Sequence, residues 1–150
     1  MAQMANITAY DGASTPALHT LLPQSVSRDK EKVTAIWRES ALGVPTNAQV
    51  RVTMTLERQK SGVYRLSSRT VVPVQEVVTG SNSAGYSAAP RVAYENTIDM
   101  VAFFHERSDV TGRRLVRQLA INIANGVTTS VAPVTTGPVA DLFDLLNAPV

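Results

Sequence analysis

An alternation of apolar and polar residues within residues 49–59 is the feature that most constrains the fold. The apolar positions are Val50, Val52, Met54 and Leu56, and the polar positions between them are Arg51, Thr53, Thr55 and Glu57. Side chains of a β-strand point alternately to opposite faces, so a period of two predicts a strand with one buried face and one wet face.

A second strand is expected after the turn residues Ser61 and Gly62. Between residues 63 and 72, Tyr64, Leu66 and Val72 share one face, and the other carries Arg65, Ser67 and Arg69. The two strands form a hairpin with their polar rows side by side. Pro73 lacks a backbone donor, so we expect a bend or a sheet edge there before a further strand at 74–78.

More strands are expected on both sides of this hairpin. Asp11-Gly12 is a two-residue turn signal, and it predicts an N-terminal hairpin within residues 6–22. The remaining segments are a polar connection at 27–32, a strand at 33–37, a Gly- and Ser-rich loop at 79–90 and a strand at 92–104.

The periodicity changes to that of a helix after residue 109. A stripe recurs at helical spacing, made of Leu115, Leu119 and Ile123 and flanked by Val116 and Ala120. Asp109 or Thr111 suits the N-cap, and Gly126 suits the position after the last turn.

A second, shorter helix is expected near the end of the chain. Pro138 suits its first turn, and Asp141 lies near the positive end of the helix dipole. The apolar stripe of this helix consists of Leu142, Leu145 and Leu146.

Strands followed by helices predict an α+β domain in which helices cover one face of an antiparallel sheet. The expected elements are the N-terminal hairpin, a five-stranded antiparallel sheet and two C-terminal helices. Only 17% of the residues are charged, below the usual ~25%. Two short helices can cover only part of this sheet, so we expect obligate dimerisation to bury the remaining apolar surface.

The sequence contains no residue constellation typical of an enzyme. It has no cysteine, and His19 and His105 lie on separate expected strands without a neighbour at metal-ligand spacing. Asp141 and Asp144 are interpreted as ordinary acids near a helix N-terminus. We therefore expect no catalysis, no metal and no cofactor. The N-terminal segment lacks an apolar leader, which predicts a soluble protein made inside the cell.

The polar rows of the hairpin are the one candidate binding surface. Of the 14 cations 11 are Arg, whose planar fork suits phosphates and base edges. The rows consist of Arg51, Thr53 and Thr55 on one strand, and Arg65, Ser67 and Arg69 on the other. RNA binding is one interpretation, and a simple solvated strand face is the alternative.

The order of the expected strands and helices, together with the local sequences, resembles the coat proteins of the leviviruses, which are single-stranded RNA bacteriophages. The resemblance covers nearly the whole chain, residues 1–150, as one coat-protein domain with a hairpin at 6–22, a sheet at 33–107 and helices at 109–148. Its short motifs are Arg51-Val52-Thr53-Met54-Thr55-Leu56, Ala93-Tyr94-Glu95-Asn96 and the ending Asp141-Leu142-Phe143-Asp144-Leu145-Leu146-Asn147-Ala148-Pro149-Val150.

The resemblance implies a structural capsid protein. Two subunits would form an intertwined dimer with a continuous sheet, and dimers would build an icosahedral shell that packages genomic RNA. The protein would be made in the bacterial host cytoplasm and end in the virion, with the phage maturation protein as a further partner. Loop 79–90 would lie at symmetry axes, without the inter-subunit disulfides of some relatives.

The resemblance also implies an RNA hairpin bound on the sheet, for translational repression or packaging. The residues that match the family's RNA contacts are Arg51, Thr53, Thr55, Arg65, Ser67, Arg69, Tyr94 and Asn96. In a regular strand, Tyr94 and Asn96 would lie on the face opposite to Glu95, Thr97 and Asp99. Either a bulge near Thr97 changes the pattern, or Tyr94 belongs to the core and the acidic residues face the RNA.

Two other functions remain open at this stage. One is a cellular dimeric RNA-binding regulator that uses the same sheet and forms no shell. The other is a shell protein whose contact with RNA is purely electrostatic, and therefore equally salt-sensitive for every RNA sequence.

Overall fold

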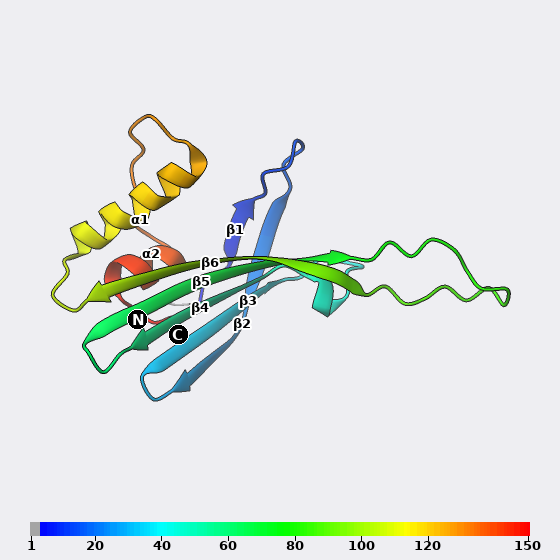
Figure 1. Ribbon diagram of the computed structural model, residues 1–150, viewed down its shortest axis with the longest axis horizontal. Helices are drawn as coiled ribbons and strands as arrows, with labels where there is room; N and C mark the ends of the chain where they lie inside the picture. The colour runs from blue at the N-terminus through cyan, green and yellow to red at the C-terminus, as the bar shows by residue number, and fades with distance from the viewer. Residues whose placement is uncertain (1–3) are drawn as a thin grey trace.

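The computed structural model describes residues 4–150, which form an antiparallel sheet with two helices (Figure 1). The order in the sheet follows the chain, from β1 to β6. The strands are β1 (Ile7–Tyr10), β2 (Leu18–Asp29), β3 (Lys32–Glu39), β4 (Arg51–Arg58), β5 (Val63–Gln75) and β6 (Val92–His105). The helices are a short 3-10 turn, Thr46–Ala48, then α1 (Val110–Asn125) and α2 (Pro138–Leu145).

The α+β class is confirmed, and the number of strands is corrected to six. The expected polar connection at 27–32 is mostly strand, because β2 continues to Asp29 and turns at Lys30, whose φ is 49°. The expected strand at 74–78 is not separate, because β5 runs through Pro73 to Gln75. Pairing with β4 ends at Val71, so Pro73 lies beyond that neighbour and costs the β4 ladder no donor.

The core lies between the sheet and α2. Trp37, Met54 and Leu66 are fully buried on one face of the sheet, and Leu142 and Phe143 of α2 pack against them. The indole N–H of Trp37 donates to the carbonyl of Ala5 at 2.9 Å, which ties the N-terminal segment to the core. We call this side the helix-bearing face, and the side with Arg51, Thr53 and Thr55 the polar face.

The ends of α1 confirm the expected caps. The carboxylate of Asp109 accepts a hydrogen bond from the backbone N–H of Gly112 at 3.1 Å. Gly126 ends the helix in the left-handed conformation, with φ at 61°.

The apolar stripe expected for α2 is only partly correct. Pro138 occupies its first turn, and Leu142 and Leu146 pack on the core. Leu145 is exposed, and Phe143 is buried in its place.

A protruding arm, residues 76–91, joins β5 to β6 at the end of the sheet away from the helices (Figure 1). At its base, Arg91 Nε donates to Glu76 Oε2 at 2.6 Å. Near its tip, Asn82 Oδ1 accepts from the backbone N–H groups of Ala84 and Tyr86. The expected loop is therefore a segment with its own internal hydrogen bonds.

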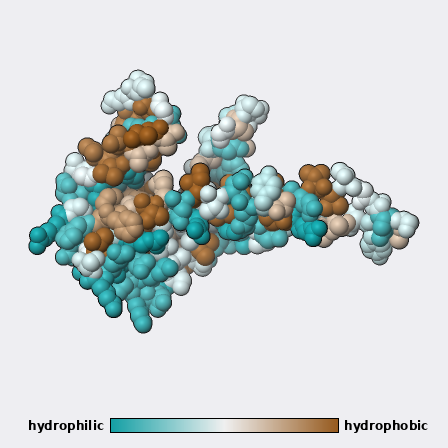
Figure 2. Space-filling model, in the orientation of Figure 1, coloured by the Kyte–Doolittle hydropathy of each residue, from teal (hydrophilic) through white to brown (hydrophobic). Residues whose placement is uncertain are grey.

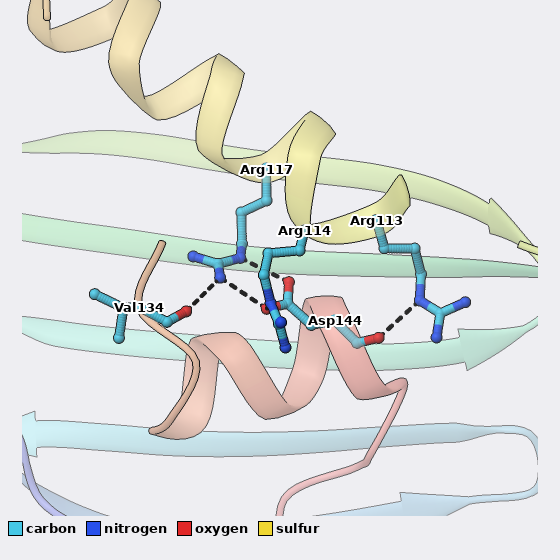
Figure 3. A network of polar contacts seen from close by, with 5 residues as sticks. All are labelled: Arg113, Arg114, Arg117, Val134 and Asp144. Atoms are coloured by element: carbon cyan, nitrogen blue, oxygen red, sulfur yellow. Dashed lines mark hydrogen bonds and ion pairs between the residues drawn. The ribbon is translucent and has the colours of Figure 1, made fainter. Parts of the chain in front are cut away.

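A buried ionic cluster joins α1 to α2 (Figure 3). Arg117 donates to both carboxylate oxygens of Asp144, at 2.8 and 2.7 Å, and also to the carbonyl of Val134. Arg114 donates to the same carboxylate at 3.1 Å, and Arg113 donates to the backbone carbonyl of Asp144 at 2.8 Å. The interpretation of Asp144 as an ordinary helix acid is wrong, because its side chain is fully buried among arginines.

The cluster keeps Asp144 ionised. Burial raises the pKa of its carboxyl, but the hydrogen bonds from Arg117 and Arg114 and their positive charges outweigh it, so the pKa lies below the ordinary value. Removing one member of a buried ion pair leaves the other charge without compensation, which costs more than the pair itself contributes.

We predict that Asp144→Asn lowers the free energy of unfolding by on the order of 3 kcal/mol, because the buried guanidinium of Arg117 loses its counter-charge. Chemical denaturation at neutral pH measures the effect. Asp141→Asn, in the first turn of the same helix, is the matched control and should change the free energy by less than ~1 kcal/mol. Equal losses in the two variants would contradict the role given to Asp144.

A second polar cluster holds the N-terminal hairpin. His19 of β2 lies between two carboxylates, with Nδ1 2.9 Å from Glu39 Oε1 and Nε2 3.4 Å from Asp11 Oδ2. Burial lowers the pKa of His19, but the hydrogen bonds and charges of Glu39 and Asp11 outweigh it and raise the pKa above 6.5. Hydrogen bonds from the backbone of Ala17 and Ala13 lower the pKa of Asp11.

These shifts predict a pH-dependent contribution of His19 to stability. Since its pKa is higher in the folded state, the contribution is complete below pH 6.5 and is lost as the pH rises through the folded pKa. Unfolding free energies from about pH 6 to 8 should converge for the wild type and His19→Gln. His105→Gln is the control, and a constant difference between wild type and His19→Gln would contradict the prediction.

Candidate nucleic-acid interface

Strand register places six of the eight candidate residues on the polar face. Thr53 is opposite Arg69, and Thr55 is opposite Ser67. Cross-strand partners share a face, so the rows predicted on β4 and β5 lie side by side. The polar face thus carries Arg51, Thr53, Thr55, Arg65, Ser67 and Arg69.

The other two candidates, Tyr94 and Asn96, lie on the helix-bearing face. The β5–β6 register is regular from Val63 to Val74, and its one irregularity falls between Val74 and Gln75. No bulge is present near Thr97, so Tyr94 and Asn96 do not join the other six.

Residues 95, 97 and 99 take the β6 positions on the polar face instead. Tyr94 is not a core residue, because 58% of its surface is exposed. Of the two alternatives drawn from the sequence, the structure therefore has the one in which the acidic residues lie on the polar face. The burial of Tyr94 that this alternative also expected is not observed.

The arginines of the polar face have carboxylates beside them. Arg51 Nη2 lies 2.7 Å from Glu95 Oε1, and Arg69 Nη2 lies 3.3 Å from Asp99 Oδ2. Arg65 Nη1 is 3.9 Å from Glu57 Oε2. The positive charge of this face is therefore largely balanced within the subunit. Thr55 and Ser67, at its centre, are buried in the single subunit.

Strand β3 adds a third row to the polar face, which sequence reasoning missed. Lys32 pairs with Glu57, Thr34 with Thr55, Ile36 with Thr53, and Arg38 with Arg51. The alternation is present in the sequence, but Ile36 interrupts its polar positions. A shallow hollow of about 180 Å³ lies at the centre of the face, lined by Lys32, Thr53, Thr55, Arg65, Ser67, Arg69 and Asp99.

Large apolar side chains remain uncovered on the other side of the molecule. The stripe of α1 points away from the subunit, with Leu115 62%, Leu119 55% and Ile123 72% exposed. Figure 2 shows this apolar surface over α1. Ile98 is also exposed on β6, which is the last strand of the sheet and has an unpaired edge within the described chain.

The part of the chain that the structure describes was also compared with two other kinds of site, metal centres and membrane-spanning helices. Residues 4–150 contain no group of three or more His, Cys, Asp or Glu side chains arranged to hold a metal ion. No helix among them is long and apolar enough to cross a membrane.

The family is decided by the match of the chain to the model of the levivirus coat protein, which extends over residues 2–143. The chain belongs to the levivirus coat protein family. It is a phage capsid protein, as its strand order and helices suggest. No curated protein sequence matches this coat protein.

Solved phage particles have similar subunits. The coat protein is 32% identical to the subunit of the virus-like particle of bacteriophage EMS014, with a TM-score of 0.72 over 87% of this chain and 82% of that one. The virus-like particle of Beihai levi-like virus 21 gives 27% identity and a TM-score of 0.64, over 89% and 98%. The particle of bacteriophage ESE058, at 23% identity and a TM-score of 0.67 over 96% of both chains, shows the same fold.

Proposed function

We propose that this coat protein forms intertwined dimers that assemble into an icosahedral shell and package genomic RNA against the polar face. In this proposal residues 1–150 act as one domain, synthesised in the bacterial host and incorporated into the virion. The observation that carries it is the outward-facing apolar stripe of α1 beside the unpaired edge of β6.

The apolar surfaces of one subunit are suited to a second copy. On the helix-bearing face, an apolar groove of about 450 Å³ runs over Val52, Met54 and Val72. The α1 stripe of a partner subunit supplies side chains of matching character, such as Leu119. Burying one such Leu side chain contributes about 1.5–3 kcal/mol, so a few of them stabilise a dimer.

Pairing of two β6 edges would extend the sheet across the dimer. An unpaired strand edge presents free backbone donors and acceptors, and a second copy satisfies them. The two polar faces would then form one continuous surface, which would give an RNA stem a broad platform on a single side of the dimer.

RNA contact is proposed for the six candidates of the polar face. Their charge is balanced by acids, so hydroxyl groups and the free edges of the arginines, more than bulk attraction, would recognise the RNA. Tyr94 and Asn96 lie on the other face, where the stem would not reach them.

The shell proposal is tested by expressing the protein alone in bacteria. Negative-stain electron microscopy should show uniform spherical particles, and their absorbance at 260 nm relative to 280 nm should reveal packaged nucleic acid. Leu119→Asp should abolish particles and dimers, because it places a charge in the apolar interface. Leu42→Asp, at a fully exposed loop position, is the control. Free dimers of the wild type without RNA would instead favour a cellular regulator.

The choice of face is tested with RNA stem-loops recovered from the particles. Thr53→Ala should weaken binding to dimers severalfold, and Tyr94→Ala should leave it unchanged. If Tyr94 instead stacks on a base of the RNA, its loss should cost ~1–3 kcal/mol of binding free energy. That result would contradict the assignment of the polar face as the only RNA-binding surface.

A further inference from the structure

Arg38, on β3, has one unsatisfied guanidinium nitrogen within the polar face. Its Nε is buried and has no hydrogen-bond partner among the described residues. None of the ion pairs within residues 4–150 includes Arg38. A buried donor without an acceptor costs about 1–3 kcal/mol, so the side chain of Arg38 is poorly satisfied within the subunit.

The cross-strand neighbour of Arg38 is another arginine. Arg38 is directly opposite Arg51 in the β3–β4 register. Like charges at directly opposite positions are destabilising. Glu95 offsets one of the two charges, since both of its oxygens accept from Arg51 Nη2, at 2.7 and 2.8 Å. The second charge of the pair has no carboxylate beside it.

Arg51 retains donors for a further ligand. Both of its hydrogen bonds to Glu95 use Nη2, so Nε and Nη1 make no side-chain bond within residues 4–150. A guanidinium has five N–H donors in a fixed plane, and one edge can hold a carboxylate while another meets a second anion.

We propose that Arg38 and Arg51 together form a phosphate-binding subsite at the edge of the polar face. The ligand would be a backbone phosphate of RNA, whose oxygens accept from the terminal nitrogens of Arg38, which is only partly buried, and from the free edge of Arg51. A phosphate beside both side chains neutralises the like-charge pair. This inference rests on the proposed RNA-binding function, and it names Arg38 as a residue that fixes the position of the RNA.

The subsite differs in kind from the centre of the polar face. At the centre, Arg69 already has Asp99 beside it, and Thr53 and Thr55 offer neutral hydroxyls. A phosphate contact carries no sequence information but fixes register and orientation. Arg38 would thus anchor one end of an RNA stem, and the hydroxyl rows would contact it farther along β4.

The test compares Arg38→Gln and Arg38→Lys with a control at the other end of β4. Arg58→Gln serves as control, because Arg58 already pairs with Glu106 at 3.2 Å and lies over the ring of Tyr64. Affinity of dimers for a labelled RNA stem-loop is measured over a range of salt concentrations. Arg38→Gln should weaken binding roughly tenfold and reduce the slope of log K against log salt by about 0.7–0.9.

Arg38→Lys should keep most of the slope of log K against log salt. Arg58→Gln should match the wild type in both affinity and slope. Stability provides an independent readout, because relief of the like-charge pair should keep or raise the free energy of unfolding in Arg38→Gln. A large loss of stability in Arg38→Gln, or an unchanged salt slope while RNA still binds, would overturn the subsite.

Inorganic phosphate separates failure of the subsite from failure of the proposed function. It should raise the melting temperature of the wild type more than that of Arg38→Gln. If the wild type binds no RNA but shows this difference in melting temperature, the result supports the phosphate subsite and contradicts the proposed RNA binding. If phosphate protects both proteins equally, the subsite is refuted whatever the RNA result.

Discussion

The register from β3 to β6, which is regular as far as Val74, is the constraint on which the rest of this structure depends. Side chains at opposed positions share a face, so the pairing of Thr53 with Arg69, and of Arg69 with Asp99, decides which groups meet. One face becomes a polar platform, and the other receives α2. A slip of one residue would exchange the two sets of side chains and remove both the core and the platform.

The helices show an unusual division of apolar and charged surface. An amphipathic helix on a lone domain normally buries its apolar stripe. Here α1 buries Arg113 and Arg117, which are held by Asp144, and exposes Leu115 and Leu119. The ionic cluster therefore fixes the rotation of α1 about its axis, and this rotation leaves the apolar stripe free for a second subunit.

The sequence predicts features whose cause is local and misses those that depend on distant residues. Alternation in β4 and the caps Asp109 and Gly126 were predictable because each rests on neighbouring residues. The role of Asp144 was not, because its partner Arg117 is far away in the chain. Similarly, the face of Tyr94 depends on pairing with β5, and Pro73 is tolerated only because β4 ends before it.

The arm at 76–91 holds its shape through its own bonds, at Glu76 and Arg91 near the base and at Asn82 near the tip. A segment that is already ordered loses less conformational entropy when a neighbouring subunit touches it. Contacts at the arm can then be weak and still be favourable. Weak contacts break quickly, so a wrongly placed subunit can leave a growing lattice before further neighbours trap it.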